Sequence, residues 1–220
     1  MKENIIGREQ EIEKLENYIS SRKSEFIAIY GRRRIGKTFL VKELFENRFA
    51  FRVTGKDNVT TKEQLTSFSF ALNDQLGIET DVTNWPEAFR LLQKALEKMT
   101  DGTKIIFFDE LPWFDTYASN FISALEHFWN DWAFYRSDIK LIACGSATTW
   151  MLNQVINSRG GLHNRITHNI LLSPFKLHEV EEYFKSQGFY YERPEIIECY
   201  MAMGGVAYYL PTTTLLLSQP

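Results

Sequence analysis

Residues 26–38 read FIAIYGRRRIGKT, and this stretch decides the fold class. Its first five residues, Phe26 to Tyr30, are all apolar, which is typical of a strand buried on both faces of a parallel sheet. The GxxxxGKT pattern from Gly31 to Thr38 follows directly, and the sequence FLVKELF from Phe39 has a helical pattern. A strand, a tight loop and a helix in this order predict a loop that binds phosphate.

The chemistry of this loop follows from its residue types. Glycines let the backbone N–H groups turn inward around a phosphate, and the helix adds its positive N-terminal end. We expect Lys37 to reach the β- and γ-phosphate oxygens of a nucleotide and the Thr38 hydroxyl to ligate Mg²⁺. The predicted nucleotide-binding residues are Gly31, Arg32, Arg33, Arg34, Ile35, Gly36, Lys37, Thr38 and Phe39. The three arginine side chains are expected to be solvated, since the backbone makes the cradle. The alternative is a strand-to-helix turn without a ligand.

Outward from this stretch, apolar runs alternate with helical patterns. Strands are predicted at 49–53, 105–108, 141–144 and 170–172, and amphipathic helices at 9–19, 62–76 and 85–99. The alternation predicts βαβ units and hence a three-layer α/β fold with a mostly parallel five-stranded sheet. After Pro174 the patterns at 177–187 and 194–203 are both helical. We therefore expect a core over residues 1–173 and the start of a helical lid, truncated, over residues 174–220.

A second motif ends the predicted strand at 105–108, where Asp109 and Glu110 follow four apolar residues. Asp109 is expected to hold Mg²⁺, directly or through water, because this hard cation prefers oxygen ligands. Glu110 is expected to orient and deprotonate a water, as the general base of a hydrolysis. The intervening stretch has room for a helix, a strand and two more helices, which places an extra strand between the two motif-bearing strands. The alternative is an ordinary strand end.

The composition excludes several classes of protein. Of the 220 residues 44% are hydrophobic, and the apolar runs are short, so we expect neither disorder nor a transmembrane helix. Cys144 and Cys199 have no spacing typical of a zinc site or a disulfide framework. The N-terminus has no apolar leader, so a cytoplasmic location is expected. The net charge of −3 argues against broad, non-specific binding of nucleic acid.

An aromatic set could suggest stacking on the bases of single-stranded nucleic acid. Its members are Trp113, Phe114, Phe128, Trp129 and Trp132. The last three are at helical spacing, however, so packing in the core or a subdomain is the favoured interpretation.

Five segments, in order along the chain, resemble the predicted AAA+ superfamily ATPases often called the archaeal-type ATPase family. They are IIGREQEIEKLENYI, YGRRRIGKTFLVKELF, IIFFDELPWF, LIACGSATTWM and GGLHNRITHNILLSPFKLHE, and the resemblance runs from Ile5 to about Leu210. It implies a P-loop NTPase of the AAA+ or STAND-like type that uses ATP and Mg²⁺. The preference for ATP over GTP rests on this resemblance, because the sequence has no NKxD-type guanine-reading motif.

The resemblance also implies roles for residues outside the two motifs. Ile6, Gly7 and Arg8 match the entry segment that packs near adenine in such ATPases, the alternative being an ordinary lead into a helix. Ser146 matches a polar residue that senses the γ-phosphate, which requires a place beside the attacking water. The alternative for Ser146 is a cap of a helix over 148–155.

Two further features bear on turnover and on partners. Arg165 matches an arginine that stabilises phosphate charge in cis or across a subunit boundary, the alternative being a surface salt bridge. The lid turn reads Gly204-Gly205-Val206-Ala207, with Ala where the family usually has Pro, which predicts a looser turn. Family members usually continue into a C-terminal domain, through which we expect a protein or DNA partner to be bound. Self-association is a further option.

These features predict an ATPase that hydrolyses Mg²⁺·ATP and thereby drives a change in the lid. Lys37, Glu110, Ser146 and Arg165 are the predicted catalytic residues, and Thr38 and Asp109 the predicted metal ligands. One alternative is a nucleotide-dependent switch or scaffold that hydrolyses little and regulates a partner protein or DNA. A weaker alternative is a small-molecule or nucleotide kinase, against which Glu110 argues because a water-activating base favours hydrolysis.

Overall fold

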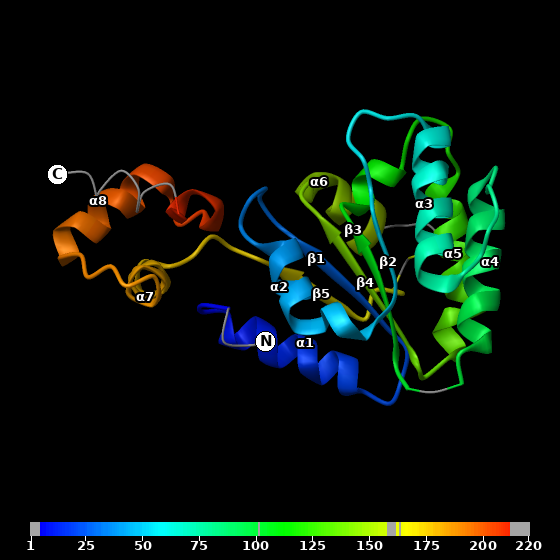
Figure 1. Cartoon of the computed structure of the whole chain (residues 1–220), viewed down its shortest axis with the longest axis horizontal. Helices are drawn as coiled ribbons and strands as arrows, with labels where there is room; N and C mark the ends of the chain where they lie inside the picture. Colours follow the sequence, from blue (N-terminus) through cyan, green and yellow to red (C-terminus); the bar gives the residue numbers. More distant parts are fainter. Residues whose placement is uncertain (1–4, 101, 158–161, 163, 212–220) are drawn as a thin grey trace.

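The computed structural model of the chain describes residues 5–100, 102–157, 162 and 164–211. Within these residues one parallel sheet of five strands forms the centre of the fold, in the order β2-β3-β4-β1-β5 (Figure 1). The strands are β1 (Glu25–Tyr30), β2 (Phe49–Thr54), β3 (Lys104–Asp109), β4 (Ile139–Gly145) and β5 (His168–Leu171). All five strands were predicted, and the α/β fold class is confirmed.

The burial of each strand follows its place in the sheet. The inner strands β3 and β4 are buried at every position and β1 at all but its last, because helices cover both faces. The outer strand β2 carries Arg52, whose side chain interrupts the apolar run. Gln75 pairs with the exposed edge of this strand: its side-chain amide accepts from the Arg52 N–H and donates to the Arg52 carbonyl, both at 2.8 Å. A polar outer strand covered in this way is protected from pairing with another chain.

Helices cover the two faces of the sheet unequally. On one face lie α1 (Glu9–Ser20) and α2 (Lys37–Phe45), and on the other lie α3 (Thr61–Leu76), α4 (Trp85–Lys98) and α5 (Phe121–Asp131) (Figure 1). The capping residues explain two of the starts, since the side chains of Thr60 and Asn84 accept from the backbone N–H groups of Glu63 and Glu87. The short elements are η2 (Glu46–Arg48), η3 (Leu111–Phe114), η4 (Ala133–Tyr135), α6 (Thr148–Trp150) and the π-helical η5 (Met151–Ile156).

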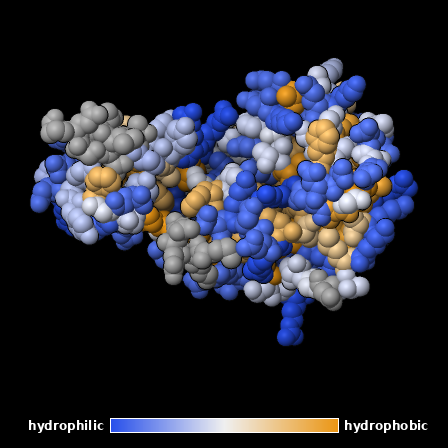
Figure 2. Space-filling view, in the orientation of Figure 1, coloured by the Kyte–Doolittle hydropathy of each residue, from blue (hydrophilic) through white to orange (hydrophobic). Residues whose placement is uncertain are grey.

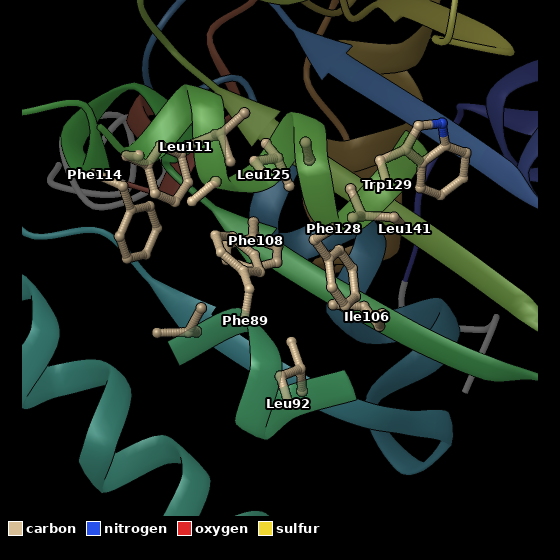
Figure 3. Packing of buried hydrophobic residues seen from close by; sticks show 14 of the residues in the cluster. Phe89, Leu92, Ile106, Phe108, Leu111, Phe114, Leu125, Phe128, Trp129 and Leu141 are labelled. Carbon is tan, nitrogen blue, oxygen red and sulfur yellow. The ribbon is translucent and has the colours of Figure 1, made fainter. Parts of the chain in front are cut away.

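The larger core lies between the sheet and α3, α4 and α5, and much of it is aromatic. Figure 3 shows Phe89 from α4 and Phe128 from α5 packed over Phe108 of β3. The ring centroids of Phe89 and Phe128 are 5.2 Å apart, and those of Phe89 and Phe108 are 5.9 Å apart. Trp129 and Phe114 are also fully buried. The favoured interpretation of the aromatic set as packing residues is therefore confirmed for its buried members.

The two motif-bearing strands, β1 and β3, are not neighbours in the sheet. The strand between them is β4, which comes later in the chain than both, whereas β2 from the intervening stretch pairs on the outer side of β3. Because all strands are parallel, the carboxyl ends of β1, β3 and β4 meet at one edge. This edge brings the residues after Tyr30, Phe108 and Gly145 together.

Beyond the sheet, residues 174–211 form a C-terminal segment with its own small core. It contains α7 (Leu177–Ser186), α8 (Arg193–Met203) and η6 (Ala207–Tyr209), and it extends away from the sheet in Figure 1. The turn at Gly205 is tight: a Cβ there would come within 2.1 Å of the Phe175 carbonyl oxygen, and φ is +67°. The Gly205 carbonyl accepts from the Phe175 N–H at 2.8 Å. The turn is thus closed by backbone contacts between Gly205 and Phe175, and the expected effect of Ala207 on it stays a prediction.

The visible surface is mostly hydrophilic, with hydrophobic residues in small separate areas (Figure 2). Among the described residues we find no helix with the length and apolar character needed to span a bilayer.

Candidate functional site

The loop between β1 and α2 has the backbone that its glycines predict. Gly31 has φ +142°, and a Cβ there would lie 2.3 Å from the Leu172 carbonyl oxygen, so only glycine fits. Gly36, with φ +97°, is the N-cap of α2 and provides no side chain to cap it. The first N–H groups of α2 are therefore left without a side-chain acceptor at this end, where the helix dipole is positive. Such a helix terminus suits an anion.

Lys37 holds its ammonium group at the mouth of this loop. Its side chain is buried, and Nζ donates to the carbonyl oxygens of Gly31 at 3.0 Å and Arg32 at 2.9 Å. Burial lowers the pKa of Lys37, and the charge of Glu110 partly opposes this. A buried ammonium bonded only to neutral carbonyls in these contacts is ready to exchange them for an anionic oxygen.

Two side chains whose oxygens could ligate a metal ion lie beside the loop. The Thr38 hydroxyl donates to Asp109 Oδ1 at 2.9 Å, and the same carboxylate oxygen accepts from the Glu110 N–H at 3.1 Å. Burial raises the pKa of Asp109, although the hydrogen bond from Thr38 acts in the opposite direction. A hydroxyl and a buried carboxylate at hydrogen-bond distance are the ligand types that Mg²⁺ prefers, so these residues fit this ion.

Glu110 and Ser146 form a second pair across β3 and β4. The Ser146 hydroxyl donates to Glu110 Oε2 at 2.8 Å, and the Ser146 N–H donates to the same oxygen at 3.1 Å. Glu110 has left-handed backbone, with φ 49°, and its carbonyl packs so close to Gly55 that a Cβ there would lie 2.6 Å away. Ser146 does not cap the following helix, whose N-cap is Ala147. The expected helix over 148–155 is a short α-helical turn followed by a π-helical one.

A cavity of about 480 Å³ opens next to the loop. Ile6 and Arg8 from the N-terminal segment and Lys37, Thr38 and Glu110 from the two motifs all contribute to its wall. Most of the other lining residues are apolar: Ile5, Ile35, Phe39, Leu40, Phe175, Tyr183, Ala207, Tyr208 and Pro211 are among them. An apolar cavity with a few polar groups in its wall is the usual form of a small-molecule site.

The sequence reasoning missed the contribution of the C-terminal segment to this cavity. Three aromatic residues of this segment line the cavity: Phe175, Tyr183 and Tyr208. None of them belongs to a recognisable sequence motif. Their one signal in the sequence is that aromatic residues recur in a segment whose helices have little core of their own to bury.

Arg8 is buried at the edge of the cavity rather than solvated. Its guanidinium lies over the Phe175 ring, 4.6 Å from the centroid, and its backbone N–H donates to Glu179 at 3.4 Å. Burial lowers the pKa of Arg8, with Glu179 opposing. Among the described residues, Arg8 Nη2 is a buried donor without a hydrogen-bond acceptor. Arg8 therefore joins the N-terminal segment to the C-terminal one and still has a free donor.

The three loop arginines are exposed, as expected, yet two of them have aromatic partners. The Arg33 guanidinium lies 5.4 Å from the centroid of the Trp113 ring. Arg34 lies 4.7 Å from the Tyr208 ring and donates to the Tyr209 hydroxyl at 2.7 Å. The expected exposure is therefore confirmed, and Arg33 and Arg34 in addition contact rings from η3 and η6.

Arg165 does not meet the other predicted site residues. It precedes β5, and Thr167 is bonded to Phe26 at the start of β1, so Arg165 lies at the amino edge of the sheet. Its guanidinium is 4.7 Å from the centroid of the Phe134 ring. The loop is at the opposite edge, so the geometry gives Arg165 no contact with a ligand of its own chain, and a role across a subunit boundary stays a prediction.

Comparison with protein families agrees with this geometry. A family described as an ATPase domain predominantly from Archaea matches residues 5–212, which is nearly the whole chain. The chain belongs to this family. An uncharacterized protein of Methanocaldococcus jannaschii, MJECL04, is 30% identical over 214 residues. The match covers 96% of the present chain and 44% of that relative, so the chain spans less than half of its length.

Solved structures of other ATPase-like proteins share the fold of this archaeal-type ATPase domain. The Walker-type ATPase PABY2304 of Pyrococcus abyssi superposes with a TM-score of 0.68 at 19% identity, covering 95% of this chain and 66% of that one. The ORC1 protein of Aeropyrum pernix, solved in complex with DNA, gives a TM-score of 0.66 at 15% identity, covering 94% and 58%. At these identities the likeness shows the fold alone, that of a P-loop ATPase.

Proposed function

We propose that this ATPase domain binds Mg²⁺·ATP at the carboxyl edge of its sheet and hydrolyses it to ADP and phosphate. The observation that carries the proposal is the convergence of the open N-terminus of α2, Lys37, the Thr38–Asp109 pair and the Glu110–Ser146 pair on one apolar cavity. The apolar walls suit a base, and the polar end suits a triphosphate.

Each residue of the site has a defined part in this proposal. The loop from Gly31 to Gly36 binds phosphate oxygens through backbone N–H groups, and Lys37 leaves the Gly31 and Arg32 carbonyls to neutralise the terminal phosphates. Thr38 and Asp109 would hold Mg²⁺, which draws electron density from the phosphate oxygens when bound. Ile6 and Arg8 bind the base side of the nucleotide, as their place in the cavity wall suggests.

Glu110 acts as the general base. Its carboxylate takes a proton from a water whose oxygen attacks the γ-phosphorus, while the bond from the γ-phosphorus to the bridging oxygen breaks and leaves ADP. Ser146 orients this carboxylate through its two hydrogen bonds. The Ser146 hydroxyl already donates a hydrogen bond to Glu110. Ser146 can therefore donate to the γ-phosphate only after this hydrogen bond breaks.

A regulatory switch that hydrolyses little is the second candidate function. The engagement of Glu110 by two donors from Ser146 favours it, since Oε2 already accepts both hydrogen bonds and is not open to a water. In this case the bound nucleotide would set the position of the C-terminal segment and of a partner, protein or DNA, attached beyond it. We further propose that residues 1–173 and 174–220 are the two moving parts and that the protein acts in the cytoplasm.

A phosphate-release assay on Glu110→Gln, with nucleotide binding measured by calorimetry, separates these functions. An ATPase loses at least about 100-fold of its turnover in this variant and keeps its affinity, because the amide cannot accept the proton. A switch shows slow release in the wild type and little change in the variant. Wild-type ADP formation that appears only with an added phosphate acceptor would contradict both and indicate a kinase.

A further inference from the structure

A second cavity, also of about 480 Å³, lies on the other side of the phosphate-binding loop. Its lining consists of Arg32, Arg33, Arg34, Glu110, Val206 and Tyr209. Arg34 and Glu110 line the first cavity as well, so the two cavities are neighbours. The lining of the first cavity is largely apolar, whereas that of the second is cationic.

Two of the three arginine side chains of this second cavity are held by aromatic residues. Arg33 rests on the Trp113 ring, and Arg34 rests on Tyr208 while it donates to the Tyr209 hydroxyl. An arginine stacked on a ring keeps its planar fork in one orientation, so less rotamer freedom is lost when it binds an oxyanion. In addition, the Arg34 carbonyl accepts from the Tyr208 N–H at 3.2 Å, which fixes the loop against η6.

The one carboxylate in the wall does not cancel this positive charge. Glu110 Oε2 is turned to Ser146, from which it accepts two hydrogen bonds. Three arginine residues and one acid therefore line this space, and Oε2 of the acid is held by Ser146. Guanidinium groups match the oxygens of phosphate in pairs, which makes this geometry suited to a phosphate-type oxyanion.

We propose that the second cavity is a separate phosphate site. Inorganic phosphate binds there after it leaves the nucleotide site beside Glu110. That the phosphate comes from ATP hydrolysis rests on the proposed function. The cavity itself is defined by the arginines and needs no hydrolysis to bind the ion from solution. The C-terminal segment closes the site through Val206 and Tyr209, so the bound ion links the loop to that segment.

Equilibrium dialysis with radiolabelled inorganic phosphate tests this site directly. The protein is loaded with a saturating non-hydrolysable Mg²⁺·ATP analogue so that the loop is occupied up to the γ-phosphate, and a nucleotide-free Lys37→Ala protein is measured in parallel. We expect phosphate to bind both proteins. Arg32→Ala and Arg33→Ala should each weaken this binding about tenfold, the effect of losing one charge-assisted contact. Arg90→Ala, an exposed arginine of α4, is the matched control and should leave it unchanged.

Three outcomes would overturn the proposal. One is absence of phosphate binding to the protein loaded with the ATP analogue. Another is loss of binding in Lys37→Ala with no loss in the loop arginine variants, and the third is equal weakening by Arg90→Ala. The first two would leave the loop as the only phosphate site, and the third would indicate general charge attraction. Arginine-dependent phosphate binding in a protein that releases no phosphate from ATP would sustain the site and refute the ATPase function, so the two failures are distinguishable.

Discussion

Both edges of the sheet bury charge, but they use it differently. At the carboxyl edge Lys37 and Asp109 are buried next to a cavity of about 480 Å³. At the amino edge Glu25, Lys104 and Lys140 are at least as deeply buried. The charged side chains at the amino edge, however, contact other groups of the same chain.

The partners at the amino edge are specific. Lys140 Nζ donates to the carbonyls of Ser21 and Lys23 and to the Ser21 hydroxyl. Lys104 bonds Asp138 at 2.6 Å. Glu25 Oε2 lies 3.2 Å from His168 Nε2, a contact that becomes an ion pair when His168 is protonated. Burial of a charge therefore does not by itself mark a functional site. What distinguishes the carboxyl edge is a loop whose glycines leave N–H groups open, beside a space of nucleotide size.

The largest predicted effect contrasts two buried lysines. Lys37→Ala should weaken Mg²⁺·ATP binding by at least about 100-fold, because it removes a charge-assisted contact to the phosphates. Lys140→Met should leave binding unchanged and lower the free energy of unfolding by about 2–3 kcal/mol, since it strands buried acceptors. Calorimetric titration and urea unfolding of both variants check this. Equal loss of ATP binding in the two variants would refute the contrast.

A second prediction concerns the ion-pair network of the amino edge. Hydrogen bonds from Arg136, then from Lys104, hold the pKa of Asp138 well below its usual range. Asp138→Asn leaves the Lys104 ammonium buried without its carboxylate, so we expect a loss of about 2 kcal/mol at pH 7 and no change in ATP affinity.

The pH dependence gives this prediction a sign. Because the folded-state pKa of Asp138 is depressed, its contribution is present above the unfolded pKa of about 3.9 and is lost as the pH falls through the folded pKa. The stability difference between wild type and Asp138→Asn should therefore shrink below about pH 4 in urea titrations. A difference that stayed constant down to the acid transition would mean that the pairing is not responsible.

Two serines give a smaller contrast. Ser146→Ala removes one of the two donors to Glu110 and should lower turnover about tenfold, with little change in KM, because the carboxylate is less well oriented. Ser24 donates to the Phe134 carbonyl at 2.7 Å at the other edge. Ser24→Ala should cost about 1 kcal/mol of stability and nothing in turnover. Rescue by Ser146→Thr, which keeps the hydroxyl, would support positioning of Glu110; unchanged turnover in Ser146→Ala would argue against it.

The smallest effect is expected at His168, which stacks on Tyr18 with ring centroids 3.5 Å apart. Burial lowers the pKa of His168, although Glu25 opposes this. The unfolded chain then binds more protons than the folded one just below the unfolded pKa of about 6.5, so stability should fall as the pH drops through this window. His168→Gln should reduce that slope by less than about 1 kcal/mol between pH 7 and 5. A steeper slope in the variant would be the contrary result in unfolding titrations.

The sequence predicted the parts of the site that are local. Each motif is a short contiguous segment: the loop contains Gly31, Gly36, Lys37 and Thr38, and Asp109 and Glu110 directly follow an apolar strand. Both motifs can therefore be recognised without knowing how distant segments pack. Contacts between distant segments could not be read in this way. The stacking of Arg34 on Tyr208 depends on how residues 174–211 fold back to the loop, which no local periodicity encodes.

The position of Arg165 was equally hidden. Its neighbourhood depends on which end of β5 it adjoins and on how β5 pairs with β1, and the parallel register of Ile27 with His168 puts it at the amino edge. A residue-by-residue resemblance does not show how β5 pairs with β1, so it could not place Arg165 at this edge. The same holds for Ser146, whose hydrogen bonds to Glu110 require β3 and β4 to be neighbours.

The most direct test of the contrast between the two edges is hydrogen–deuterium exchange with and without Mg²⁺·ATP. We predict that ATP slows amide exchange in residues 31–40 and 5–8 and leaves residues 21–25 and 138–140 unchanged, with no response in Lys37→Ala. Protection confined to the amino edge, or none at residues 31–40 at saturating ATP, would contradict the assignment of the nucleotide site to the carboxyl edge.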